Sequence, residues 1–107
     1  MELGQYSIIL VNLDPTVGSE IKKTRPCVII SPNEMNKYLR TIVVAPLTTN
    51  LKNYPTRIPV KTKGKKGMIA IDQIRTIDKQ RIVKVFNSLS KSEIQKCKEV
   101  LKETFVD

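Results

Sequence analysis

The sequence predicts a mainly β fold with a single C-terminal helix, arranged as a small barrel-like domain. Short runs of β-branched and aliphatic residues recur as far as Phe86, separated by polar loops that contain proline or glycine. From Ser90 onward the apolar spacing becomes helical. With 107 residues, 40% of them hydrophobic, the chain is expected to form one domain over residues 1–107.

Four strands are expected in the first part of the chain. Each run of apolar residues begins or ends next to a proline, which cannot donate a ladder hydrogen bond. The proline inside the fourth run favours an edge strand. The four runs are residues 6–13, 27–30, 41–45 and 57–61.

Two further strands and a helix are expected after a basic turn at residues 62–67. The β pattern resumes at residues 68–71, continues into 72–77 and returns at 82–86. Ser90 and Glu93 fit a capping box, and Leu89 with Ile94 fits a hydrophobic staple, so a helix should begin there. The apolar stripe of this helix is expected to comprise Ile94, Cys97, Val100, Leu101 and Phe105.

The charge of the chain is strongly positive and unevenly distributed. Nineteen Lys and Arg residues against ten Asp and Glu residues give a net charge of +9 and a pI near 9.8. Residues 90–107 are balanced, so the whole excess lies in residues 1–89. This favours a polyanionic partner, with nucleic acid first and an acidic protein segment second. We find no signal peptide and no apolar run of about 20 residues, so a cytoplasmic protein without membrane contact is expected.

The rare residue types exclude several kinds of site. Histidine is absent, which excludes Ser-His-Asp and Cys-His triads, histidine-based ribonuclease sites and histidine-containing zinc sites. Cys27 and Cys97 are too far apart in sequence for a CxxC motif. They are expected to be two buried thiols, with a disulfide as the alternative.

Two polar loops, residues 14–26 and 45–55, concentrate the side chains suited to chemistry. Arg25 directly precedes a buried strand, and its planar guanidinium suits a phosphate better than a lysine does. Thr48 follows another strand and offers a hydroxyl. The alternatives are that Arg25 pairs with Glu20 or Asp14, and that Thr48 is only a turn residue.

Three blocks of these residues resemble the MazF/PemK family of toxin endoribonucleases from type II toxin–antitoxin systems. The first spans residues 13–20 (Leu-Asp-Pro-Thr-Val-Gly-Ser-Glu) and 24–32, which begins Thr-Arg-Pro. The second is Ala-Pro-Leu-Thr-Thr-Asn at residues 45–50, followed by Tyr54-Pro55. The third is Asp-Gln-Ile-Arg-Thr-Ile-Asp at residues 72–78. Their order and spacing hold across nearly the whole chain.

The resemblance implies a homodimeric SH3-like barrel of the MazF/CcdB type. It also implies cleavage of single-stranded RNA at a short sequence without a metal or other cofactor, and inhibition by an acidic, MazE-like antitoxin protein. Arg25 and Thr48 match the catalytic pair of MazF-type members, and Glu20 matches a glutamate implicated in some. The expected RNA-binding residues, drawn from these blocks and the basic residues beside them, are Thr16, Val17, Ser19, Lys22, Lys23, Asn50, Lys52, Tyr54, Asp72 and Gln73.

The chain departs from the family pattern at three positions. Some PemK-type members carry a histidine at the position of Ser19 and an arginine at that of Ala70, so a MazF-type site is favoured. Asn50 stands where many members have glutamine, so base preference near it is expected to differ. Tyr54 has the alternative role of packing its loop, and Asp72 that of capping a turn.

The expected reaction uses the nucleophile that RNA itself carries. Attack of a 2′-OH on the adjacent phosphorus leaves a 2′,3′-cyclic phosphate and a 5′-OH, while the protein aligns the groups and stabilises charge on the phosphate. One alternative is a non-enzymatic binding module, which includes a gyrase-poisoning toxin of related fold. Another is a Mg²⁺ nuclease that uses Asp14, Glu20, Asp72 and Asp78.

Overall fold

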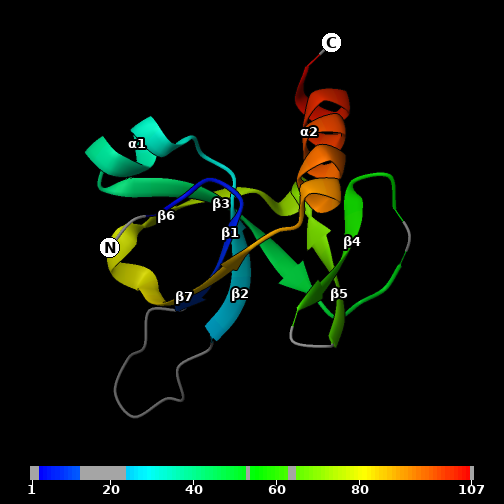
Figure 1. Cartoon of the computed structure of the whole chain (residues 1–107), viewed down its shortest axis with the longest axis horizontal. Helices are drawn as coiled ribbons and strands as arrows, with labels where there is room; N and C mark the ends of the chain where they lie inside the picture. The colour runs from blue at the N-terminus through cyan, green and yellow to red at the C-terminus, as the bar shows by residue number, and fades with distance from the viewer. Residues whose placement is uncertain (1–2, 13–23, 53, 63–64, 107) are drawn as a thin grey trace.

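The structure, a computed structural model, describes residues 3–12, 24–52, 54–62 and 65–106 (Figure 1). The strands of this part are β1 (Ser7–Asn12), β2 (Thr24–Ile29), β3 (Thr41–Thr48), β4 (Arg57–Thr62), β5 (Lys65–Ala70), β6 (Arg75–Asp78) and β7 (Ile82–Ser88). The helices are α1 (Asn33–Tyr38) and α2 (Lys91–Phe105), with short 3-10 helices η1 (Ile71–Gln73) and η2 (Lys79–Arg81).

All the described strands join one antiparallel sheet, in the order β4-β5-β3-β2-β1-β7, with β6 paired to β3 off this path. β3 is the junction: its first half pairs with β6, and its last two residues pair with β5. Figure 1 shows β4 and β5 beside α2, and β1, β2 and β7 on the other side of β3. The expected mainly β fold with a C-terminal helix is confirmed. The sheet is bent into a barrel-like form but does not close on itself.

The sheet has an apolar cluster on each face, because successive residues of a strand point to opposite sides. On β1, Ile8 enters the first cluster and Ile9 the second. The first cluster includes Cys97 and Val100 of α2, so this helix covers that face. The second cluster contains Cys27 and is formed by β1, β2, β3 and β6. Residues at the ends of these strands can therefore be assigned to a face by counting.

The expected C-terminal helix is confirmed, including its start. The Ser90 hydroxyl accepts a hydrogen bond from the Glu93 amide, and the Glu93 carboxylate accepts one from the Ser90 amide. Cys97 is buried and free, as is Cys27, which confirms the expectation of two buried thiols. The prediction that Phe105 belongs to the apolar stripe is wrong, because this last residue of α2 is 58% exposed. None of the described helices has the length and apolarity to cross a membrane.

The sequence patterns missed several local features. The strand expected at residues 41–45 continues to Thr48, and the strand expected at residues 68–71 already begins at Lys65. The first strand begins at Ser7 rather than Tyr6, since Tyr6 adopts a positive φ of 68° and its amide donates to the Ile29 carbonyl. Helix α1 was not expected; its buried Asn36 donates to the Leu3 and Ser31 carbonyls, which fixes the helix against the chain. The pattern at residues 72–77 is interrupted by η1 before β6 begins.

Candidate functional site

Arg25 is the second residue of β2 and pairs with Val11 of β1. The Cys27 thiol donates to the Arg25 carbonyl at 3.7 Å. The Arg25 side chain is exposed, and among the described residues nothing accepts a hydrogen bond from its guanidinium. Glu20 and Asp14, its alternative partners, lie outside the described residues. The backbone of Arg25 is therefore held by the sheet, while its charged end is open to solvent within the described part of the chain.

Thr48 is the last residue of β3 and is half-buried. Its hydroxyl oxygen accepts a hydrogen bond from the Asn50 amide at 3.1 Å, which is the expected turn contact. That bond uses an oxygen lone pair and leaves the hydroxyl proton free to be donated. On the other side Thr48 pairs with Met68 of β5, and a Cβ added at Gly67 would lie 3.3 Å from the Thr48 carbonyl oxygen. Thr48 is thus fixed between a turn and a close backbone neighbour.

Strand register relates Arg25 to Thr48. Cys27 pairs with Pro46, which is the last pair between β2 and β3, and Arg25 and Thr48 each lie two residues beyond it. Directly opposite residues share a face of the sheet, so Arg25, which pairs with Val11 of the second cluster, belongs to the face of the Cys27 cluster. Thr48 instead continues β3 into its pairing with β5. The two residues therefore lie at the same end of neighbouring strands.

Asp72 is engaged by Arg57 rather than free. The Arg57 Nε and a terminal nitrogen donate to its two carboxylate oxygens at 2.9 and 3.2 Å, and the Thr56 hydroxyl donates at 2.9 Å. The hydrogen bond from Arg57 holds the pKa of Asp72 below its usual range, and the bond from Thr56 acts in the same direction. The Arg57 guanidinium also lies 5.4 Å from the centre of the Tyr54 ring. These contacts favour the packing alternative for Tyr54, whereas Asp72 forms an ion pair with Arg57 in place of the turn cap given as its alternative.

The other expected RNA-binding residues divide into exposed ones and ones the structure does not describe. Asn50 and Lys52 are exposed, and the Asn50 side-chain oxygen accepts from the Lys52 amide at 3.2 Å. Gln73 is exposed at the end of η1, which contacts β3. The residues outside the described part are Thr16, Val17, Ser19, Glu20, Lys22 and Lys23.

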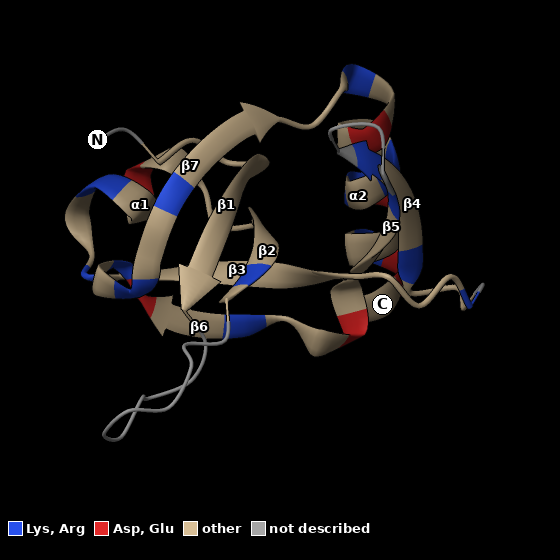
Figure 2. Cartoon of the chain, turned by 90° about the horizontal axis from the view of Figure 1, so that it is seen from below, with Lys and Arg blue, Asp and Glu red and all other residues tan. Residues whose placement is uncertain are grey.

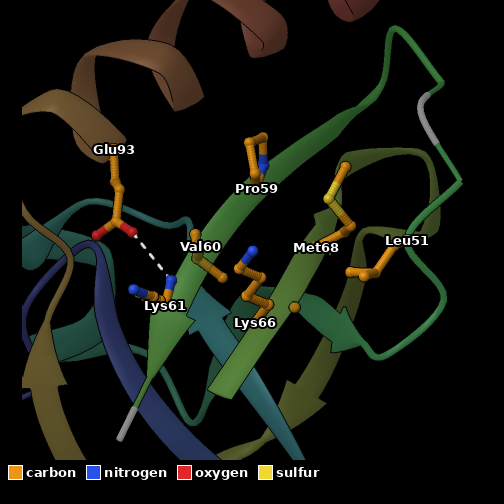
Figure 3. Close-up of a pocket in the computed structure, with 8 residues that line it drawn as sticks. Leu51, Pro59, Val60, Lys61, Lys66, Met68 and Glu93 are labelled. Carbon is orange, nitrogen blue, oxygen red and sulfur yellow. Dashed lines mark hydrogen bonds between the residues drawn. The ribbon is translucent and has the colours of Figure 1, made fainter. Parts of the chain in front are cut away.

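A pocket of about 510 Å³ lies at the paired strands β4 and β5 (Figure 3). Met68 and Gly67, the neighbours of Thr48 on β5, belong to its lining, and Leu51 follows Thr48 along the chain. In Figure 3 Lys66 also lies at this pocket. The rest of the lining is Pro59, Val60, Lys61 and Glu93, whose carboxylate accepts from the Lys61 amide at 3.3 Å. Sequence patterns gave no sign of this pocket, because the β4–β5 pairing assembles it from ordinary strand residues.

Arg75 is a second exposed arginine near Cys27 that the sequence analysis did not single out. Burial raises the pKa of the Cys27 thiol to about 11, and the charges of Arg25 and Arg75 both oppose that rise. Figure 2 shows one blue band on β2 and one on β6, which are these two arginines. The signal in the sequence was the arginine inside the third block, directly before an alternating strand.

The described residues give no support to a carboxylate metal site. No three acidic or cysteine side chains gather within this part of the chain. Of the four carboxylates that the Mg²⁺ alternative needs, Asp14 and Glu20 lie outside it and Asp72 is bound by Arg57.

Comparison with known proteins identifies relatives over almost the whole chain. Residues 4–105 match the family described as PemK-like, MazF-like toxin of type II toxin-antitoxin system. The Endoribonuclease MazF of Staphylococcus epidermidis is 37% identical over 93 residues, which cover 81% of this chain and 78% of that protein.

Solved structures with this arrangement of strands and helix are also known. The Mycobacterium tuberculosis toxin MazF-mt6 matches with a TM-score of 0.78 at 22% identity, covering 92% of this chain and 95% of that one. A crystal structure of MazE-MazF from Deinococcus radiodurans matches with a TM-score of 0.80 at 20% identity, covering 96% and 95%. At these identities the likeness establishes the fold.

Proposed function

The chain belongs to the PemK-like, MazF-like toxins of type II toxin–antitoxin systems, and on that premise we propose that Arg25 and Thr48 form its RNA-cleaving centre. It is an endoribonuclease toxin, like the relative with which it shares 37% identity over most of the chain. One observation carries the assignment of the centre. Arg25 and Thr48 each lie two residues beyond the last β2–β3 pair, Cys27 with Pro46, which supports the proposal that they share one site.

The proposed reaction needs no nucleophile from the protein. The 2′-oxygen attacks the adjacent phosphorus, a new P–O2′ bond forms and the P–O5′ bond breaks. The products are a 2′,3′-cyclic phosphate and a 5′-OH. The 2′-OH loses its proton to a base and the departing 5′-oxygen takes one from water, so the step balances without a metal or other cofactor.

Arg25 is proposed to stabilise the charge that grows on the phosphate oxygens. Its guanidinium presents several N–H donors in a plane, and no described side chain competes for them. Donors that are already in place when charge develops give the largest single contribution in many enzymes. Arg25 is a poor proton donor because a guanidinium holds its protons tightly.

Thr48 is proposed to donate a hydrogen bond from its hydroxyl to another phosphate oxygen. The hydrogen bond from the Asn50 amide orients the hydroxyl oxygen and leaves its proton available. Glu20, outside the described residues, is proposed to take the 2′-OH proton. The pocket at β4 and β5 combines apolar side chains with Lys61 and Lys66, which suits an unstacked base and its phosphate.

The partners follow from the family and from charge. The Deinococcus radiodurans relative is known in a MazE-MazF structure. We propose that this chain likewise acts as a homodimer on single-stranded mRNA in the cytoplasm and is neutralised by an acidic antitoxin segment. A net charge of +9 favours both the RNA and an acidic inhibitor on the same surface.

The test is cleavage of a long, weakly structured RNA by the purified protein in excess EDTA, with mapping of the new 5′ ends. Discrete cuts with 5′-OH ends that disappear in Arg25→Ala are the expected result. The absence of cuts across several RNAs, from a folded protein free of antitoxin, would favour a binding module. Cuts that appear only with added Mg²⁺ would contradict the role of Arg25.

A further inference from the structure

Arg75 occupies the first position of β6, beside the central strand. It pairs with Val44 of β3, which on its other side pairs with Ile29 of β2. Opposite residues share a face, so Arg75 lies on the face of the Cys27 cluster. Counting back from Ile29 along β2 leads through Cys27 to Arg25 on that same face.

The two arginines flank Cys27 from different strands. Their Cα atoms are separated by roughly 10 Å across two strand spacings and roughly 13 Å along the strand. The charge of each acts on the buried Cys27 thiol, so both arginines lie within electrostatic range of it. Arg25 lies at the Thr48 end of the sheet, and Arg75 lies further back along the strands, level with Val44.

Arg75 differs from the arginines that stabilise the fold. Arg57 donates to Asp72, and Arg81 donates to the Asn12 carbonyl at 3.3 Å. Among the described residues nothing accepts a hydrogen bond from Arg75, and no carboxylate lies within ion-pair distance of it. Two exposed guanidiniums on one face of the sheet repel each other, so the binding of phosphates stabilises both of them.

We propose that Arg75 binds the phosphate next to the scissile one, so that Arg25 and Arg75 hold two successive phosphates of the RNA strand. This inference rests on the proposed function, because it takes Arg25 as the ligand of the scissile phosphate. Arg75 is a substrate-binding residue in this arrangement. It fixes the register of the strand on the sheet and takes no part in bond breaking.

The first test measures binding and turnover separately. Binding is followed by fluorescence anisotropy of a short single-stranded RNA with a 2′-deoxy nucleotide at the cut site, which removes the nucleophile. Arg75→Gln should weaken binding about tenfold, and the slope of log K against log salt should fall by about 0.7, the value for one phosphate on a single strand. The cleavage rate at saturating RNA should stay within about twofold of wild type.

Two variants serve as controls. Arg75→Lys keeps the charge without the planar fork and should recover most of the affinity. Arg40→Gln removes the same charge from an exposed arginine on the link between α1 and β3, and should leave both affinity and salt slope unchanged. An equal loss in Arg40→Gln would mean a general charge effect and would overturn the inference.

The second test identifies the phosphate. Neutral methylphosphonate linkages replace the phosphates flanking the cut site one at a time. Wild type should lose affinity at one flanking position, and Arg75→Gln should be insensitive to that same replacement. Equal sensitivity in both proteins at every flanking position would overturn the assignment.

The outcomes separate this inference from the proposed function. If wild type cuts RNA and Arg75→Gln binds as wild type does, the inference fails and the function stands. If wild type cuts none of the RNAs tested, the function fails, and the Arg75→Gln comparison on unmodified single-stranded RNA still decides whether Arg75 binds phosphate. Should Arg75→Gln fail to fold, Arg75→Met, which also removes the charge and keeps a long side chain, takes its place in both tests.

Discussion

Two regions of the sheet each carry an arginine, Arg25 on β2 and Arg57 on β4, but the two side chains have different surroundings. At the end of β2, Arg25 is exposed with no described side chain bonded to its guanidinium. At the start of β4, Arg57 binds both oxygens of Asp72 and covers the ring of Tyr54. The side chain of Arg57 is only 10% exposed.

The difference shows which arginines are available for a phosphate. A guanidinium already paired with a carboxylate must give up that pair before it binds an anion, so Arg57 stabilises the fold. Arg25 and Arg75 pay no such penalty. We therefore expect substitutions in the first region to change RNA cleavage with little change in stability, and substitutions in the second to do the reverse.

The largest expected effect is that of Arg25→Ala. Removing a donor to the developing charge should lower the cleavage rate by about 10²- to 10³-fold. The melting temperature should hardly change, because the side chain is exposed. Arg25→Lys, with a point charge and no fork, should recover part of the rate. A rate near wild type in Arg25→Ala, measured under single-turnover conditions, would remove Arg25 from the centre.

Thr48→Val should have the next largest effect. The valine keeps the shape but loses a hydroxyl that donates to a charged oxygen, a bond of about 1.5–3 kcal/mol. The cleavage rate should therefore fall roughly 10- to 100-fold. Thr48→Ser should stay close to wild type, since it keeps the hydroxyl and the contact with the Asn50 amide. If Thr48→Ser loses as much as Thr48→Val, the methyl group matters and the hydroxyl does not.

Gly67→Ala should have a smaller effect that acts through position. The new Cβ would lie 3.3 Å from the Thr48 carbonyl, so one of the two strands must move by a few tenths of an ångström. We expect about a threefold loss of rate, roughly 0.7 kcal/mol in the barrier. Gly4→Ala is a matched control, because its Cβ would also lie 3.3 Å from an atom, the Ser7 hydroxyl, away from the candidate site. Equal rates in the two variants would show that Thr48 tolerates the shift.

The sequence was sufficient to predict most of the secondary structure. Prolines and β-branched runs located β1 to β4, and the capping box at Ser90 located the start of α2. The proline inside the fourth run also predicted β4 as an edge strand, which it is in the described sheet. These signals are local, so they do not depend on what the chain packs against. Helix α1 escaped notice because its six residues are stabilised by buried hydrogen bonds of Asn36 and lack an apolar stripe.

The candidate site was less predictable than the fold. Family blocks pointed to Arg25 and Thr48, but only the pairing of Cys27 with Pro46 shows that they lie beyond the same end of the β2–β3 pairing. The ion pair of Asp72 with Arg57 could not be predicted, because only the pairing of β4 with β5 brings these two residues together. Arg75 was missed for the same reason: its nearness to Cys27 comes from the pairing of β6 with β3. Long-range pairing decides which polar side chains are free.

Asp72→Asn is the smallest expected change in activity and tests the other half of the comparison. The substitution removes the negative charge that pairs with Arg57. Because the carboxylate is partly exposed, the free energy of unfolding should fall by only about 1 kcal/mol, and the melting temperature by about 5 °C. The cleavage rate should stay within about twofold of wild type.

The pH dependence of Asp72→Asn gives a sharper form of the test. Arg57 holds the pKa of Asp72 below its usual range in the folded protein, so the wild-type advantage in the free energy of unfolding should be complete above about pH 5. The advantage should shrink as the pH falls through the lowered pKa, because the protonated acid no longer attracts Arg57. Urea unfolding of both proteins between pH 7 and pH 3 measures this directly. If Asp72→Asn instead loses cleavage while its stability matches wild type at every pH, Asp72 contacts the RNA, and the division between free and engaged residues fails at that position.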